Sequence, residues 1–260
     1  MTAVVSVQAA IEELASDPLR NIVLLKQLLA YPEHVKVRRV CGSQGVATLV
    51  AVDASTIPYD RETYPKAGMV AFISSDHPEL TELLTLDVPR GIGVVFKLSR
   101  EADLAPVASR FSVTRRTSFV SFTAAGECES DPDVHVTSAP GDGAFALFET
   151  QGHDRTWLAS LLASGKAFAC VLGRHDDILS ACFTFENYGA VWEVGGVVTA
   201  RAHRRKGLGA RVVRAVLAEF DTRGLAPRYQ AEESNTASIR LAGSVGLVPF
   251  LTIVHYTHAC

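Results

Sequence analysis

The residues best suited to chemistry lie within residues 194–213, in the sequence VGGVVTARAHRRKGLGARVV. Its apolar pattern predicts a strand that ends before the basic stretch Arg204–Lys206 and a helix that starts at about Gly207. The start of a helix offers unpaired backbone N–H groups and the positive end of the helix dipole, and both bind phosphate. Because Gly207 and Gly209 have no side chains, a diphosphate could approach these amides closely. The segment therefore predicts a diphosphate site.

The motifs of the common nucleotide-binding loops are absent. The chain has no Gly-x-x-x-x-Gly-Lys-Ser/Thr motif, and no Gly-x-Gly-x-x-Gly follows a first βαβ strand. A basic helix start without a ligand remains the plain alternative. Nucleic-acid binding through Arg201–Lys206 is disfavoured by the formal net charge of -3 and by the lack of an aromatic platform.

Two motifs in this half resemble the GNAT superfamily of acyl-CoA-dependent acyltransferases. Residues 204–209, RRKGLG, match the family's Arg/Gln-x-x-Gly-x-Gly/Ala loop, and Val197–Thr199 matches the end of the preceding strand. The stretch NTASIRLAGSVGL, residues 235–247, resembles the family's later Asn-x-x-Ala/Ser helix. The resemblance covers residues 134–260, and its Asn-x-x-Ser variant is similar to the glycine acyltransferase-like branch.

This resemblance implies acetyl-CoA or another acyl-CoA as co-substrate, with no metal. The strand backbone would bind the pantetheine arm, the loop would bind the diphosphate, and the later helix would add contacts. The implied cofactor-binding residues are Val197, Val198, Thr199, Arg204, Arg205, Lys206, Gly207, Leu208, Gly209, Ala210, Asn235 and Ser238. Asn235 could equally be only a helix N-cap, a position that asparagine favours.

Direct transfer of an acyl group to an amine needs a proton acceptor and N–H donors for the thioester oxygen. Glu193, on the strand before Val197, is the first candidate for the base, although a lone glutamate in a strand is often an exposed surface residue. Glu232–Glu233 is the reserve. The N–H of Val197 or Val198 would face the oxygen, and a bulge at Gly195–Gly196 would open a slot for the thioester.

The sequence departs from the family pattern at one catalytic position. Many members have a tyrosine seven residues after the asparagine of the later helix, where it protonates the departing thiolate, but this chain has Ala242. Tyr256 or His255 could take this role, or the thiolate could leave without an acid. We include Tyr256 with Glu193 as the predicted catalytic residues.

The surrounding elements predict an α+β (mixed α/β) fold in two domains, 1–130 and 131–260, separated in a segment rich in Pro, Gly, Asp and Ser. The expected helices are 19–29, 78–84, 154–163, 207–223 and 235–245. The expected strands are 37–40, 46–52, 69–73, 92–98, 167–172, 178–185, 190–199, 228–231 and 250–257, and residues 134–136 could form an edge strand.

The N-terminal half carries no chemical motif that we would defend. Its order of elements is similar to that of the C-terminal half, so it could be a degenerate copy of the same fold. In that case the counterpart of the phosphate loop would follow residues 92–98, in SREADLAPVASR, which has no glycine. We therefore expect no cofactor there and a role in shaping the acceptor pocket or a subunit interface.

Composition favours a soluble cytoplasmic enzyme. The five scattered cysteines predict reduced thiols, the N-terminal residues lack a signal-peptide pattern, and no apolar run is long enough to cross a bilayer. His255 and His258 are too isolated to predict a metal site. The expected function is N-acyltransfer, most simply N-acetyltransfer, to a small-molecule amine or an amino acid by a monomer or homodimer, without nucleic-acid or membrane partners. The alternative is a non-catalytic acyl-CoA-binding or regulatory protein.

Overall fold

The computed structural model describes residues 2–124, 126, 128–174 and 177–260. They form two compact units: unit 1 holds the residues up to Val120 together with Leu251–Cys260, and unit 2 holds Ser121–Phe250. This division differs from the predicted domains 1–130 and 131–260 because the last strand belongs to unit 1. The predicted α+β (mixed α/β) class is confirmed.

Unit 1 contains a sheet in the order β1-β2-β3-β4-β5-β12, in which β4 and β5 are parallel and the other recorded pairs are antiparallel. Its strands are β1 (Thr2–Val4), β2 (Val35–Gly42), β3 (Gly45–Asp53), β4 (Met69–Ser75), β5 (Val94–Leu98) and the end of β12 (Leu247–His258). Its helices are α1 (Val7–Leu14), α2 (Ile22–Ala30), α3 (Pro58–Thr63), α4 (Pro78–Thr85) and α5 (Leu104–Ala108). Strand β6 (Val113–Ala124) begins in this unit.

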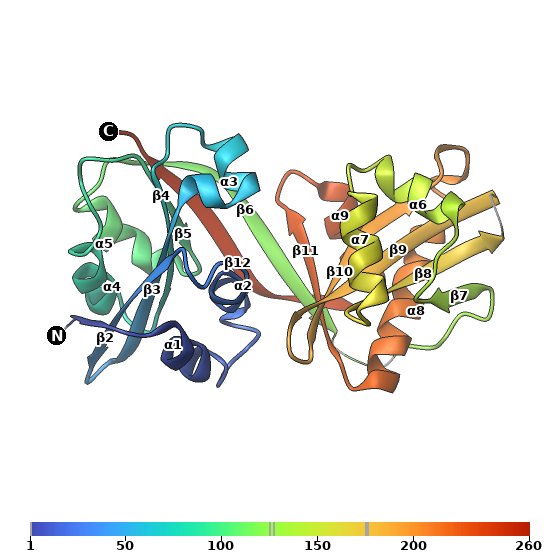
Figure 1. Ribbon diagram of the computed structural model, residues 1–260, viewed down its shortest axis with the longest axis horizontal. Coiled ribbons are helices and arrows are strands. Elements are labelled where there is room, and N and C mark those ends of the chain that lie inside the picture. Colours follow the sequence, from blue (N-terminus) through green and yellow to red (C-terminus); the bar gives the residue numbers. More distant parts are fainter. Residues whose placement is uncertain (1, 125, 127, 175–176) are drawn as a thin grey trace. The chain divides into compact units, whose positions relative to one another are not determined.

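Helices cover both faces of this sheet, with α4 and α5 on one side of β2–β5 and α2 on the other (Figure 1). Alternate residues of the central strands point to opposite faces. On the α4 side, Leu49, Ile73, Phe96 and Leu84 belong to one buried apolar cluster. The core of unit 1 is therefore formed by strand alternation and by the apolar faces of short helices.

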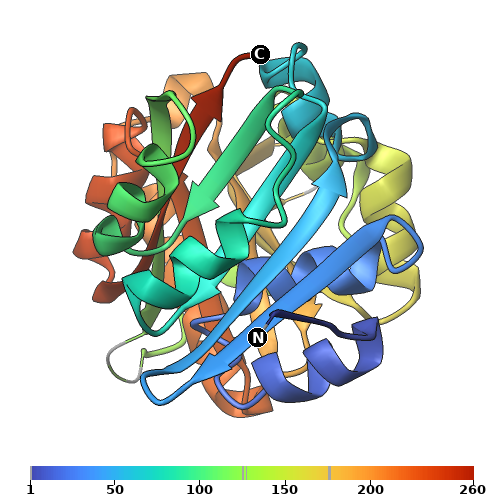
Figure 2. The same cartoon turned by 90° about the vertical axis from the view of Figure 1, so that its left-hand side faces the viewer.

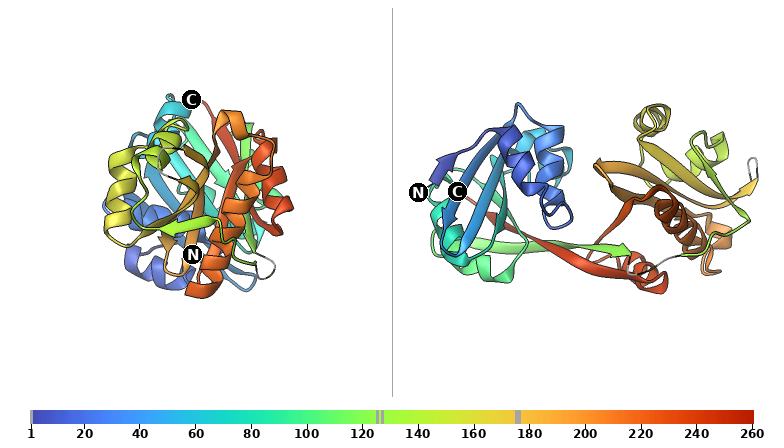
Figure 3. Two further views of the ribbon diagram at one scale, coloured as in Figure 1. Left: turned by 90° about the vertical axis from the view of Figure 1, so that its right-hand side faces the viewer. Right: turned by 90° about the horizontal axis from the view of Figure 1, so that it is seen from below.

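Unit 2 contains the strand order β6-β11-β10-β9-β8-β7. Its strands are the end of β6, β7 (Val134–Thr137), β8 (Ala167–Arg174), β9 (Asp177–Tyr188), β10 (Val191–Thr199) and β11 (Ala226–Glu232). Its helices are α6 (Asp142–Glu149), α7 (Arg155–Ala163), α8 (Leu208–Arg223) and α9 (Thr236–Ser244). Figure 3, right, shows α6 and α7 on one face of the sheet and α8 on the other. The predicted edge strand at 134–136 is confirmed as β7.

The two halves of the chain repeat one order of elements: strand, two helices, three strands, helix, strand, helix and strand, with α3 as an insertion in the first half. The final strands are exchanged, since β12 pairs with β5 in unit 1 and the end of β6 neighbours β11 in unit 2. Figure 2 faces unit 1 and shows β12, in red, running to the C-terminus among its strands. The similar order expected for the N-terminal half is therefore confirmed.

The repeat corrects one expectation about unit 1. The parallel pair β4–β5 corresponds to β10–β11, so the counterpart of the phosphate loop follows β4 rather than residues 92–98. The shift arose because the short β1 and the long, polar β6 were not predicted. At this place the start of α4 is already occupied: His77 accepts a hydrogen bond from the N–H of Glu79, and Pro78 has no N–H.

Candidate active site

Strand β10 carries a β-bulge at its two glycines. Its pairing with β9 is in register from Trp192 to Gly195 and resumes at Val198 after one extra residue in β10. Gly196 has a φ of +57°, and a Cβ atom at this position would lie 2.0 Å from Cε1 of Phe183. Both the left-handed backbone and the close aromatic ring require glycine. The predicted bulge is confirmed.

Just beyond this point, β10 and β11 stop pairing. Their parallel register runs from Val191 opposite Ala226 to Val194 opposite Tyr229, whereas β10 continues to Thr199. The last residues of β10 therefore extend beyond the shared ladder. An extended ligand arm can bind main-chain groups of such a segment as an added strand would.

The loop after β10 leads to an exposed helix start. Residues Arg201–His203 form a short 3-10 turn, and both Arg205 and Gly207 have positive φ, of 62° and 75°. Gly207 is the N-cap of α8 and supplies no side-chain hydrogen bond. The N–H groups of the first turn thus lack a side-chain cap, as an anion site requires. A left-handed arginine is also uncommon enough to suggest a functional constraint.

The charges of this loop are only partly used by the protein itself. Arg204 Nε donates to the carbonyl of Thr199 at 3.1 Å, whereas Arg205 and Lys206 are exposed and take part in none of the ion pairs within the described residues. At Gly209 a Cβ atom would make ordinary contacts, the nearest at 3.6 Å from Thr199 Oγ1. The fold itself therefore does not require glycine there, and its absent side chain fits a cradle for a diphosphate.

One turn into α8, Arg211 forms a clamp that the sequence did not reveal. Its Nε donates to Asp131 at 2.6 Å, and its Nη2 donates to Asp131 at 2.8 Å and to Asp133 at 2.6 Å. The Arg211 hydrogen bonds hold the pKa of Asp131 below its usual range. This clamp ties the segment before β7 to the helix that follows the basic loop.

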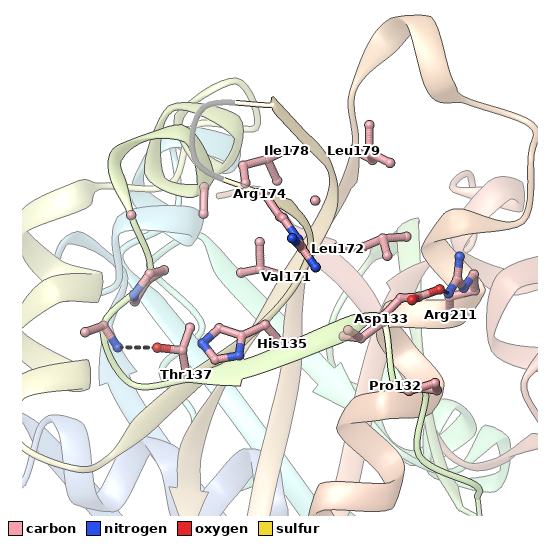
Figure 4. A pocket seen from close by; sticks show the side chains of 16 residues that line it. Pro132, Asp133, His135, Thr137, Val171, Leu172, Arg174, Ile178, Leu179 and Arg211 are labelled. Atoms are coloured by element: carbon pink, nitrogen blue, oxygen red, sulfur yellow. Dashed lines mark hydrogen bonds and ion pairs between the residues drawn. The ribbon is translucent and has the colours of Figure 1, made fainter.

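The clamp lies at the border of a cavity of about 840 Å³. Figure 4 shows the Asp133–Arg211 pair on one side of this cavity and His135 and Arg174 on the other. Leu179 also lines it, and the carbonyl of Leu179 accepts from the N–H of Ala200 at 2.9 Å. The cavity is thus next to the end of β10, where the basic loop begins.

Glu193 is not an exposed surface residue but is buried, with 8% of its surface exposed. Its Oε2 accepts from Asn187 Nδ2 at 2.8 Å and from Arg228 Nη1 at 2.5 Å. Arg228 lies directly opposite Glu193 in the parallel ladder. Neither partner was predicted, although an arginine in a predicted strand can itself indicate a buried acidic partner. Of the reserve candidates, Glu232 ends β11.

The predicted general acids fall in the other unit. Tyr256 is opposite Phe96 in the β12–β5 ladder, and its side chain packs against the apolar cluster of unit 1. His255 is also buried there, with Nδ1 2.9 Å from Tyr64 Oη, and burial lowers its pKa to about 3. Ala242 is fully buried. The structure therefore does not bring Tyr256 into the unit that holds Glu193.

Helix α9 carries the remaining predicted contacts. Asn235 caps this helix, because its Oδ1 accepts from the N–H of Ser238 at 3.1 Å; its contact with the cofactor stays a prediction. Burial raises the pKa of Tyr229, and nearby Ser238 opposes this rise. Asn235 thus has a structural role at the start of α9 and remains exposed.

Neither a metal centre nor a membrane helix is found in the described part of the chain. It contains no group of three or more His, Cys, Asp or Glu side chains placed to hold a metal ion. No helix in it is long and apolar enough to cross a membrane. All five cysteines are free thiols.

Comparison with known proteins agrees with this geometry. The model of the acetyltransferase (GNAT) family matches residues 127–247, a range that includes β10, the basic loop, α8, β11 and α9. A search of curated proteins found no match.

Several solved structures share the fold. A GCN5-related N-acetyltransferase from Sphaerobacter thermophilus is 12% identical with a TM-score of 0.58, over 90% of this chain and 84% of that chain. An acetyltransferase of the GNAT family from Colwellia psychrerythraea is 12% identical with a TM-score of 0.57, over 99% of both chains. A tandem GNAT protein from the clavulanic acid biosynthesis pathway is 13% identical with a TM-score of 0.52, over 99% of this chain and 97% of that chain. At these identities the likeness concerns the fold. The family match itself is limited to residues 127–247, and it supports an enzyme of the N-acetyltransferase type.

Proposed function

We propose that this enzyme transfers an acetyl group from acetyl-CoA to the primary amine of a small molecule or an amino acid by direct aminolysis. The proposal rests on the exposed start of α8, which has a left-handed Gly207 and no side-chain cap. The preceding strand, β10, extends beyond its parallel ladder with β11. The first feature suits a diphosphate and the second suits an extended amide-bearing arm.

The residues present fit acyl-CoA at three points. The N–H groups from Arg205 to Ala210 would hold the diphosphate, with the side chains of Arg205 and Lys206 adding charge. The backbone of Val197–Thr199 would hold the pantetheine arm, and α9 would border the site through Ser238. When bound, acyl-CoA supplies a thioester that a neutral amine attacks without a covalent enzyme intermediate.

Within this scheme Glu193 accepts the proton of the acceptor amine as the C–N bond forms and the C–S bond breaks. The N–H of Val197 or Val198 donates to the carbonyl oxygen while negative charge develops there. Position 242 is an alanine, and Tyr256 is partly buried against the apolar cluster of unit 1. We therefore favour departure of the thiolate without a protein acid, because an ordinary thiol has a pKa of about 8.5 and its anion is a stable leaving group.

The proposal also includes finer points taken from the sequence. The Asn235–Ser238 motif suggests the glycine acyltransferase-like branch of the superfamily. The free cysteines favour a cytoplasmic location. The chain would act as a monomer or homodimer. Unit 1 would shape the acceptor side or a subunit interface.

Release of CoA thiol tests the reaction. The chain is incubated with acetyl-CoA and panels of amino acids, polyamines and aminoglycosides, and the same panels are run with Glu193→Gln. We expect turnover on at least one panel and a loss of kcat of about 100-fold in the variant, within the usual range for a general base. Tight acetyl-CoA binding without turnover on any amine would instead favour a binding or regulatory protein.

A further inference from the structure

Two buried polar side chains grip Glu193 from its two neighbouring strands. Arg228 comes from β11 and Asn187 from β9, and each donates to the same carboxylate oxygen, Oε2. Arg228 is 3% exposed and Asn187 is 8% exposed. Two directional bonds to one oxygen fix both the position and the rotation of a carboxylate.

The backbone explains why these side chains meet. Arg228 faces Glu193 in the parallel ladder. On the other side, the register of β9 and β10 shifts between Val191 and Trp192, and the shift leaves Asn187 without an opposite residue. A bulge of this kind redirects a side chain. The cluster lies one residue before Val194, the last residue of β10 in the ladder with β11, so it is located where the two strands begin to diverge.

Two polar atoms of the cluster have unused hydrogen-bonding capacity. Arg228 Nε and Asn187 Oδ1 are buried and have no hydrogen-bond partner within the described protein. Most buried polar groups are hydrogen-bonded, so each exception needs an explanation, and a catalytic role is one of them. Glu193 Oε1 likewise accepts no hydrogen bond from the described residues, since both recorded bonds go to Oε2.

We propose that Arg228 and Asn187 are positioning residues, which hold Glu193 through Oε2 so that Oε1 receives the proton of the acceptor amine. This inference rests on the proposed function, in which Glu193 is the base. It adds that the base is fixed before substrate arrives, which shortens the search for a reactive geometry. Arg228 and Asn187 act through Glu193 and do not contact the substrate.

A double-mutant cycle tests this role. Asn187→Ala, Arg228→Lys and Arg228→Met are prepared alone and together with Glu193→Gln, and three quantities are measured: kcat and KM by CoA release, the Kd of acetyl-CoA by calorimetry, and the midpoint of urea unfolding. We expect kcat to fall about 10-fold for Asn187→Ala and further for Arg228→Met, with Arg228→Lys retaining more activity. The Kd of acetyl-CoA should stay within about twofold of the unmodified chain.

The decisive result is the behaviour on the Glu193→Gln background. If both residues act through Glu193, adding Asn187→Ala or Arg228→Met should reduce kcat by less than about twofold more. Thr184→Val serves as the control, because Thr184 is also fully buried in β9 with an unbonded hydroxyl but does not contact Glu193. Its kcat should equal that of the unmodified chain.

Two outcomes overturn the inference while the proposed function stands: losses of kcat that multiply with that of Glu193→Gln, or full activity in Asn187→Ala. If Arg228→Met does not fold, the milder Asn187→Ala still decides between these results. An unmodified chain that neither binds acetyl-CoA nor releases CoA would refute the proposed function itself, and the positioning role with it.

Discussion

Gly207 and Gly224 cap the two ends of helix α8, and both have a left-handed backbone, with φ of 75° and 65°. A Cβ atom at either position would meet no atom within 4 Å. Replacement by valine therefore introduces the same backbone strain at both ends without a steric clash inside the protein. Only Gly207 adjoins the proposed diphosphate site, so Gly224→Val is a matched control for Gly207→Val.

The two variants should lose similar stability but differ in ligand affinity. Left-handed backbone costs a residue with a side chain about 1–2 kcal/mol, which lowers the Tm of a chain of this size by about 2–8 °C. At Gly207 the side chain would also keep the phosphates from the amides of the first turn. Loss of about two hydrogen bonds to a charged group costs about 3 kcal/mol or more, equivalent to an affinity about 150-fold weaker.

Calorimetric titration with acetyl-CoA and thermal unfolding of both variants provide the measurements. Gly224→Val should keep the Kd of the unmodified chain within about twofold, while Gly207→Val weakens it by about 100-fold at an equal loss of Tm. Equal affinities in the two variants would show that the start of α8 does not bind the diphosphate, and the assignment of the cofactor site would have to be abandoned.

Three further predictions concern stability. Gly196→Ala should lower the free energy of unfolding by about 2–5 kcal/mol, since left-handed strain adds to an aromatic clash. Gly189 is left-handed but a Cβ there meets no clash, so Gly189→Ala should lose clearly less stability. Equal urea midpoints of the two variants would contradict this. Asp60→Asn should lower the free energy of unfolding by about 3–5 kcal/mol, because it leaves buried Lys97 without its charged partner at 2.8 Å. A decrease below about 1 kcal/mol would show that the charge of Asp60 is not needed to keep Lys97 buried. Burial keeps His255 neutral in the folded state, with a pKa of about 3, whereas the unfolded chain takes up a proton below about 6.5. The contribution of neutral His255 to stability is therefore complete above about pH 6.5 and declines by about 1.4 kcal/mol per pH unit as pH falls toward 3. The free energy of unfolding in urea should fall between about pH 6.5 and 5.0, and this fall should be about 2 kcal/mol larger in the unmodified chain than in His255→Gln.

The two parallel strand pairs carry different residues near the ends of their ladders. In unit 2 the ladder pairs Glu193 with Arg228, whereas in unit 1 it pairs Phe72 with Lys97. Lys97 is buried, as Arg228 is, but its carboxylate comes from Asp60 on the inserted helix α3. Burial lowers the pKa of Lys97 against the opposing charge of Asp60. Unit 1 thus keeps a buried cation at a similar place and has a phenylalanine where the proposed base would be.

Much of unit 2 was predictable because its signals are local. The bulge depends on adjacent glycines, and the helix ends depend on Gly207 and Gly224, whose conformations follow from the absence of a side chain. The α6 helix and the 12-residue β6 were missed because their patterns are weak. The partners of Glu193 were missed for a different reason. Arg228 is 35 positions away in the ladder of β10 and β11, Asn187 lies at a register shift between β9 and β10, and periodicity carries no information about either pairing.

By itself, the amino-acid sequence determined the strand, basic loop and helix of the proposed cofactor site, because each is specified by neighbouring residues and by the period of its own element. Only the tertiary structure decided that the last strand belongs to unit 1, where Tyr256 packs against an apolar cluster, and that Glu193 is buried between Arg228 and Asn187. Strand exchange and side-chain burial depend on which distant segments pair, and this choice minimises the free energy of the whole chain rather than of any segment.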